Sequence, residues 1–193
     1  TLMPIKVLNA SGSGAITDIV MGIDYAVASG AKVINLSLGG NPFANLPNVV
    51  DFDFLDENSL RHADARGVVV VTAAGNDHAS LPVKPASFAN AICVAAVTED
   101  DRLTEFSNYG PGVTVAAPGY SMYSAAHTGT SAYNYLGGTS QAAPVVSGVA
   151  ALLLQKDPAL TPRQVKDILQ ATADDLGPAG RDDFYGFGRV NAA

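Results

Sequence analysis

The chain has 193 residues, of which 48% are hydrophobic and 15% charged, and its formal net charge is −7. This apolar content supports a buried core and excludes a disordered chain, and the acidic balance argues against a nucleic-acid partner because phosphate binding needs a basic face. A single cysteine excludes an intrachain disulfide framework and a multi-cysteine zinc site. No apolar run reaches roughly 18 residues, so we expect no membrane span and no membrane partner.

The first half of the chain alternates apolar strands with amphipathic stretches. Four strands are predicted, at Ile5–Leu8, Val33–Leu38, Val68–Ala74 and Ile92–Val97. Apolar residues at helical spacing predict a helix that ends at Gly30, and a second helix is predicted around Glu57–Arg66. This β-α-β-α-β order predicts an α/β fold in which the four strands are adjacent in one parallel sheet with right-handed crossovers.

The second half differs in composition. Residues 98–139 are rich in Gly, Ser, Thr and Tyr, which predicts short strands and loops. Ser140–Gln155 is apolar nearly all round, which predicts a buried helix with four core residues, Val146, Val149, Leu152 and Leu153. Thr161-Pro162-Arg163-Gln164 predicts the start of a last helix with a capping box. We see no domain boundary and predict one domain over residues 1–193.

A serine stands at the start of the predicted buried helix, in Gly138-Thr139-Ser140-Gln141. The N-terminus of a helix offers unpaired N–H groups and the positive end of the helix dipole, and both favour an oxyanion beside that serine. A plain helix-capping serine is the alternative interpretation. Gly129-Thr130-Ser131 repeats the same three letters, but no apolar helix follows, so we predict a loop there.

Two further motifs follow predicted strands at the carboxyl edge of the sheet, where parallel α/β proteins bind ligands. Ala73-Ala74-Gly75-Asn76 closes the third strand. An Asn amide there can donate to a developing negative charge, an effect worth about 10²–10³ in rate; an Asn-containing turn is the alternative. Ser37-Leu38-Gly39-Gly40 closes the second strand, and its alternative is a tight turn.

Together, the segments Asn35–Gly40, Val71–Asn76 and Gly138–Pro144 resemble the subtilisin-like serine proteases (subtilases, peptidase family S8). Further similar stretches are Pro4–Leu8, Phe106–Gly110, Ala117–Gly119 and Gly186–Ala192. The resemblance covers essentially the whole chain, in order. It implies a three-layer α/β/α subtilisin-like fold and a serine endopeptidase that cleaves polypeptides by acyl transfer.

The resemblance also implies a role for each matching residue. Ser140 matches the nucleophile, and the Asn76 side chain and the Ser140 backbone N–H match the two oxyanion donors. Substrate binding is implied for three groups of residues. The segment that pairs with an extended substrate is matched by Ser37, Leu38 and Gly39. One wall of the pocket that holds the residue before the cleaved bond is matched by Ala73, Ala74 and Gly75, and the approach to the nucleophile by Gly138.

The chain departs from the family in its other two triad residues. The family's Asp motif and its His-Gly-Thr-His motif are absent and would lie upstream of Thr1. The chain therefore resembles the C-terminal two-thirds of a catalytic domain, lacks the N-terminal strands and is expected to be nearly inactive alone. The expected partners are a polypeptide substrate and the missing N-terminal segment that bears Asp and His.

Three histidines are candidates for a replacement base. His62 is predicted to be a solvated surface residue. His78 and His127 stand near the motifs, and either would have to reach the Ser140 hydroxyl at hydrogen-bond distance. If Ile5–Leu8 lacks its neighbouring strand, it is an exposed edge, and we expect pairing with another chain, including self-association.

No cofactor and no metal are expected. The resemblance allows a calcium site in the intact family domain, but a family ligand position is Thr114 here, so the residues of this chain do not support one. Glu99-Asp100-Asp101 is interpreted as a solvated turn, with a calcium contact as the alternative. Cys93 lies in an apolar strand and is predicted to be a buried, inert thiol. An extracellular location is implied by the family alone, since no signal peptide is visible in a chain that starts within a domain.

Two other function classes compete with a protease. A catalytically inactive peptide-binding fragment is compatible with the motifs, because main-chain pairing at Ser37–Gly39 does not require the triad. A nucleotide-binding βαβ unit is suggested by Gly12 and Gly14, but Thr17 replaces the third glycine of that motif.

Overall fold

The computed structural model describes residues 1–40, 52–126 and 129–193. A four-stranded parallel sheet has the order β1-β2-β3-β4, made of β1 (Val33–Leu36), β2 (Val69–Ala73), β3 (Ala91–Val97) and β4 (Val115–Pro118). An antiparallel hairpin follows, made of β5 (Met122–Ala125) and β6 (Tyr133–Leu136). The helices are α1 (Ile16–Ala28), α2 (Phe52–Ala65), α3 (Thr139–Lys156) and α4 (Pro162–Ala171).

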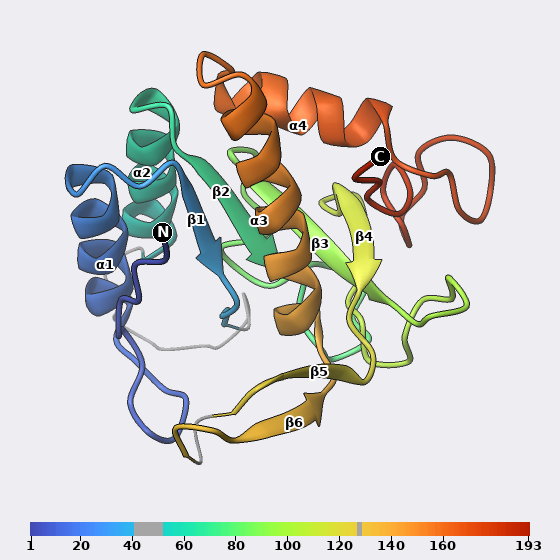
Figure 1. Ribbon diagram of the computed structural model, residues 1–193, viewed down its shortest axis with the longest axis horizontal. Helices are drawn as coiled ribbons and strands as arrows, with labels where there is room; N and C mark the ends of the chain where they lie inside the picture. Colours follow the sequence, from blue (N-terminus) through green and yellow to red (C-terminus); the bar gives the residue numbers. More distant parts are fainter. Residues whose placement is uncertain (41–51, 127–128) are drawn as a thin grey trace.

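Helices cover both faces of the sheet (Figure 1), which confirms the predicted three-layer α/β architecture. Alternate residues of β2, β3 and β4, such as Val71 and Val94, pack with α3 and α4 in one core cluster. The neighbouring residues Ile34 and Val70 pack with α1 and α2 on the opposite face. All residues of β2 and β3 are buried, as a continuous apolar strand between two layers requires.

The predicted strand at Ile5–Leu8 is wrong, because residues 5–8 pair with no strand. Val7 packs instead on α1, so closely that a Cβ on Gly22 would lie 2.6 Å from its Cγ1. The fourth strand of the sheet is β4, at the opposite edge, where the backbone of Val190 donates to Ala116 O at 2.9 Å. Among the described residues, the sheet edge without a paired strand is therefore that of β1.

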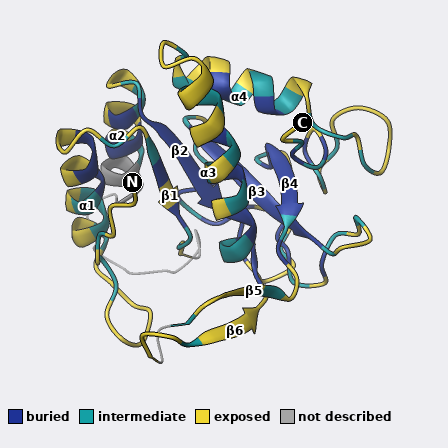
Figure 2. Cartoon of the chain, viewed as in Figure 1, coloured by how far each residue is buried: buried dark blue, intermediate teal, exposed yellow. Residues whose placement is uncertain are grey.

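A groove of about 860 Å³ runs along this open edge, between residues 1–7, α1, β1 and α3. The face of α3 that lines it includes exposed residues, among them Pro144, Gly148 and Ala151 (Figure 2). The prediction that α3 is buried on all sides is therefore wrong for this part of the helix.

The four expected core residues of α3 differ in burial. Val146 is fully buried, Val149 and Leu153 are half-buried, and Leu152 is 58% exposed. The physical reason is that no layer of the described chain covers the outward side of α3 here. Leu152 is thus a surface residue.

We expect Leu152→Ala to reduce the free energy of unfolding by less than about 1 kcal/mol, because exposed positions change stability little. Leu169→Ala is the matched control, since Leu169 on α4 is 0% exposed, and a buried leucine of this kind costs about 2–5 kcal/mol when truncated. Urea unfolding of both variants measures the difference. Equal losses would show that the α3 face is covered in solution.

A charged network ties the C-terminal segment to the loop after β3. Arg189 Nη1 donates to both carboxylate oxygens of Asp101 at 2.7 Å, and its Nη2 donates to Asp174 at 2.7 Å. Asn191 Nδ2 donates to the other Asp174 oxygen at 3.0 Å. Asp101, interpreted from the sequence as part of a solvated turn, is therefore half-buried and ion-paired.

This network makes stability depend on pH in the acid range. The hydrogen bonds from Arg189 and Asn191 lower the pKa of Asp174. Its contribution is therefore present above the unfolded value of about 3.9 and is lost as the pH falls through the folded pKa. Between about pH 5 and pH 2 we expect the urea midpoint of the wild type to fall more steeply than that of Asp174→Asn. Parallel curves for the two proteins would contradict this.

No helix within the described ranges is both long enough and apolar enough to cross a bilayer.

Candidate functional site

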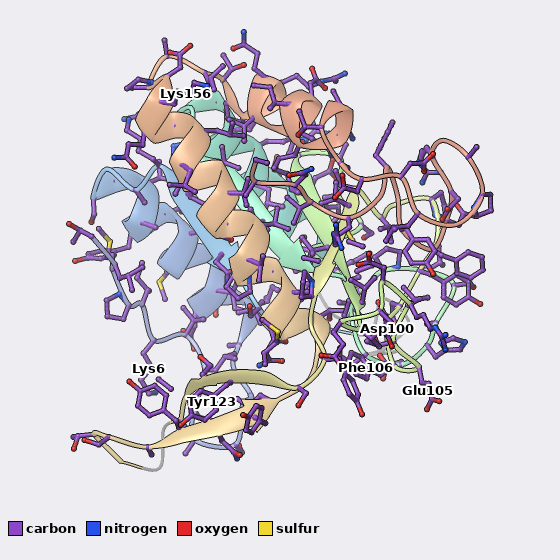
Figure 3. The ribbon with its side chains drawn as sticks, turned by 45° about the vertical axis from the view of Figure 1, so that its right-hand side comes forward. Lys6, Asp100, Glu105, Phe106, Tyr123 and Lys156 are labelled. Atoms are coloured by element: carbon purple, nitrogen blue, oxygen red, sulfur yellow. The ribbon has the colours of Figure 1, made fainter. Side chains whose placement is uncertain are left out.

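The three sequence motifs meet at the N-terminal end of α3. In Figure 3, Lys156 marks the far end of this helix, whereas Phe106 and Tyr123 lie toward its beginning. The segments that follow β1 and β2 arrive here from the carboxyl edge of the sheet, and β6 leads through two glycines into the helix. The fold therefore places residues from distant parts of the sequence around Ser140.

Ser140 is held against the end of β1 by two hydrogen bonds. In the first, the Ser37 hydroxyl donates to the Ser140 carbonyl at 2.7 Å; this Ser37 hydroxyl in turn accepts from Asn35 Nδ2 at 2.9 Å. In the second, the Ser140 hydroxyl donates to the Ser37 carbonyl at 3.4 Å. This last bond is long and therefore weak, which leaves the Ser140 hydroxyl free to turn toward a better partner.

Asn76 caps the N-terminus of α3 through its side-chain oxygen. Its Oδ1 accepts from the Thr139 backbone N–H at 2.8 Å and from the Thr139 hydroxyl at 3.0 Å. Because a backbone N–H can only donate, the amide oxygen of Asn76 must face the helix and its Nδ2 must face away. Asn76 is exposed, and within the described part of the chain no group accepts a hydrogen bond from its Nδ2.

A second donor lies beside the first. The Ser140 backbone N–H belongs to the first turn of α3, where a helix has no internal acceptor, and no described residue accepts from it. The first turn carries no acidic residue, so the positive end of the helix dipole is not compensated there. Two unpaired donors and this dipole make the N-terminus of α3 suited to a developing oxyanion.

Thr139 joins the end of β2 to the beginning of α3. Its hydroxyl accepts from the Gly75 backbone N–H at 3.0 Å while it donates to Asn76. Gly75 has φ 109°, a backbone conformation that favours glycine, and a Cβ at this position would strike the Asn108 side chain.

Asn108 is a supporting residue that the sequence reasoning missed. It is fully buried, its Nδ2 donates to Ala74 O at 3.1 Å, and its Oδ1 accepts from the backbones of Asp77 and Ala79 at 2.9 Å each. These bonds fix the loop that carries Asn76. The available signal was its place in Phe106–Gly110, one of the stretches that resemble the subtilases, but no role was assigned to Asn108 there.

The remaining predicted site residues lie in the same region. Leu38 is half-buried and Gly39 exposed after β1, and the next residue, Gly40, pairs with Lys84 in an isolated antiparallel bridge. Ala73 and Ala74 are buried at the end of β2, and Gly138 is buried directly before α3. The structure thus brings the predicted residues together, and their roles in catalysis remain a prediction.

The candidate replacement bases contact other groups. His62 is an exposed residue of α2 whose Nδ1 lies 3.1 Å from Asp24 Oδ1. The His78 backbone donates to Phe106 O, and its ring centroid lies 5.4 Å from that of Tyr109. Neither of these two histidines hydrogen-bonds to Ser140, and His127 lies outside the described residues.

The expected loop and the expected inert thiol are both found. Gly129-Thr130-Ser131 forms an exposed turn between β5 and β6. Cys93 is buried, and burial raises the pKa of its thiol to about 12, so it stays protonated and unreactive.

Thr114 stands at a position that is a calcium ligand in the family, and here its hydroxyl bonds to the backbone of β3. Its hydroxyl accepts from the Cys93 backbone N–H at 3.1 Å. Across the described ranges, no group of three or more His, Cys, Asp or Glu side chains is arranged to hold a metal ion.

Comparison with known proteins gives one consistent result. The model of the Subtilase family matches residues 1–188. Over 192 residues, 99% of this chain, the sequence is 41% identical both to M-protease of Shouchella clausii (strain KSM-K16) and to Subtilisin Savinase of Lederbergia lenta. The crystal structure of a lanthipeptide protease superposes with a TM-score of 0.87 at 25% identity, covering all of this chain and 68% of that one.

The similarity extends over only part of each relative. The matched region is 47% of M-protease and 66% of Subtilisin Savinase, so this chain spans about half to two-thirds of their length. The site geometry, the family match and the structural likeness nevertheless agree over essentially the whole chain. The chain belongs to the subtilase family.

Proposed function

We propose that this chain carries the nucleophile and the oxyanion site of a serine endopeptidase that hydrolyses polypeptides. The observation that carries the proposal is the orientation of Asn76. Thr139 holds its Oδ1 at the N-terminus of α3, so that Asn76 Nδ2 and the Ser140 backbone N–H are unpaired donors beside the Ser140 hydroxyl.

The proposed reaction is acyl transfer. Ser140 Oγ attacks the peptide carbonyl carbon, and the carbonyl oxygen takes up the negative charge between Asn76 Nδ2–H and the Ser140 N–H. Collapse of this intermediate breaks the C–N bond, and the amine leaves with the proton taken from Ser140. Water then hydrolyses the Ser140 ester and releases the second product, so the reaction as proposed uses no cofactor.

A serine hydroxyl is a weak nucleophile without an adjacent base, and we propose that His and Asp come from a separate segment of the protein. The groove beside β1 supports this, because it is apolar along α1 and α3 and borders the free sheet edge. A strand parallel to β1 would pair with that edge and cover the exposed face of α3. Self-association of two copies through β1 is the competing use of the same surface.

We also propose an extracellular location, which rests on family membership alone. Substrate binding is proposed for the segment after β1 and for the end of β2, through main-chain hydrogen bonds to an extended peptide.

The test begins with the sequence encoded upstream of Thr1. If it carries an Asp motif and a His motif, that segment is co-expressed with residues 1–193, and cleavage of an internally quenched peptide is measured with and without it. We expect near-background hydrolysis by the chain alone and protease-level hydrolysis by the complex. Peptide binding without hydrolysis in the complex, or an upstream sequence that lacks both motifs, would favour the peptide-binding fragment instead.

A further inference from the structure

The carbonyl group of Ser140 lacks its usual partner within α3. In a helix, the carbonyl of a residue accepts from the N–H four residues later, and here that residue is Pro144, which has no N–H. The Ser37 hydroxyl donates to this Ser140 O at 2.7 Å. The carbonyl of the proposed nucleophile is therefore bonded to a side chain of the segment after β1.

Asn35 determines where the Ser37 hydroxyl directs its proton. A serine hydroxyl has one proton, so it donates to one acceptor at a time. Asn35 Nδ2 donates to the Ser37 hydroxyl at 2.9 Å. Because an amide N–H offers no lone pair, the Ser37 proton finds no acceptor in that direction and is left for Ser140 O.

The Asn35 amide is oriented from its other side. Ser147 Oγ donates to Asn35 Oδ1 at 3.0 Å, and the same hydroxyl lies 3.0 Å from Ala143 O. An amide that presents its oxygen to Ser147 presents its nitrogen to Ser37. The chain of hydrogen bonds thus begins and ends in α3 and crosses to β1 in between.

Asn35 is the one polar residue of β1, since Val33, Ile34 and Leu36 are apolar. Side chains alternate along a strand, and Ile34 and Leu36 pack in the core cluster with α1. Asn35 therefore faces α3, where it is exposed beside the groove. An asparagine is disfavoured in strands, and an exposed one adds no apolar burial, so its contribution here lies in its two hydrogen bonds.

We infer that Asn35 is a positioning residue for the nucleophile. It directs the Ser37 hydroxyl to Ser140 O and thereby holds the first turn of α3 against the end of β1. The inference rests on the proposed endopeptidase function, because this position matters to catalysis only if Ser140 attacks the substrate. Asn35 acts through Ser37 and not on the substrate, so its loss should lower kcat and change KM little.

The test is Asn35→Asp, measured in the complex with the upstream segment. The aspartate has nearly the same shape but presents an acceptor to Ser37, so the Ser37 proton turns away from Ser140 O. We expect kcat to fall by about 10–100-fold, since misplacing a reacting group by about 1 Å can cost about 10²-fold. Asn134→Asp in β6 is the matched control: Asn134 is exposed, its oxygen accepts from the Tyr135 N–H at 2.8 Å, and its replacement should leave kcat/KM unchanged.

A double-mutant cycle tests whether Asn35 acts through Ser37. Ser37→Ala removes the bond to Ser140 O, so adding Asn35→Asp to it should lower kcat no further. Additive losses would mean that the new carboxylate acts by another route, such as its charge beside the groove, and would overturn the inference.

Crystal structures of the complex with and without Asn35→Asp separate the inference from the proposed function. The substitution should lengthen the distance from Ser37 Oγ to Ser140 O beyond about 3.5 Å, out of hydrogen-bond range. An intact Ser37–Ser140 bond, or an unchanged kcat while Ser140→Ala abolishes hydrolysis, would overturn the inference and leave the protease function standing. A wild-type complex that does not hydrolyse peptides would overturn the proposed function and, with it, the role of Asn35.

Discussion

Replacing Ser140 with alanine in the complex with the upstream segment should abolish peptide hydrolysis. We expect kcat to fall by about 10⁶-fold, which is the loss that removal of the nucleophile causes in subtilisin, a member of this family. The reason is that Ser140 Oγ forms the covalent bond to the substrate, and no other hydroxyl of the site can replace it. In the 193-residue chain alone the same substitution should change hydrolysis little, because without a base the hydroxyl is not activated.

The chain offers a matched control for this result. Ser131 stands in the same Gly-Thr-Ser sequence as Ser140 but lies in an exposed hairpin turn rather than at a helix N-terminus. Ser131→Ala should leave kcat/KM unchanged. If Ser140→Ala kept more than about 1% of wild-type kcat, its assignment as the nucleophile would be wrong, given the penalty expected for losing one.

Replacing Asn76 with alanine should lower kcat of the complex by about 10²–10³-fold and change KM little; this range, too, comes from subtilisin itself. The Nδ2 donor bonds to an oxygen that becomes negative only in the transition state, so its loss acts on the chemical step rather than on substrate binding. Steady-state kinetics with one peptide substrate separates the two constants.

Asn76→Ala also removes the cap of α3, and Asn76→Asp distinguishes the two effects. The aspartate keeps an oxygen for the Thr139 N–H and hydroxyl, so the helix remains capped. It lacks the donor and places a negative charge beside the oxyanion. We expect Asn76→Asp to lose at least as much kcat as Asn76→Ala while it keeps the wild-type urea midpoint. Full activity in Asn76→Asp would mean that Asn76 only caps the helix.

Local pattern was sufficient for most of the fold and insufficient where a distant layer decides. β2 and β3 follow from continuous apolar runs, and the capping box of Thr161 and Gln164 forms as predicted. Ile5–Leu8 has a strand-like pattern, but a strand exists only where an edge pairs with it, and Val7 packs on α1 instead. Leu152 is exposed for a related reason, since burial of its side chain needs a layer over the outward side of α3 and no described segment supplies one.

The positions of the candidate site followed from motifs, whereas its hydrogen bonds did not. Ser140, Asn76 and Ser37 were identified as chemistry-bearing residues at helix and strand ends, and the structure places them together. The bridging role of Thr139 joins side chains 63 residues apart, and Asn108 reaches Ala74 over 34 residues. Such contacts depend on tertiary geometry, and no spacing rule within one segment predicts them.

The most direct test of the central claim is covalent labelling of the nucleophile. The 193-residue chain is incubated with a fluorophosphonate, with and without the upstream segment, and the modified serine is located by peptide mass spectrometry. We expect one adduct, on Ser140, that forms rapidly only when the segment is present and that Asn76→Ala slows. Labelling of Ser131, or peptide hydrolysis by the complex while Ser140 stays unmodified, would contradict the assignment of Ser140 as the nucleophile.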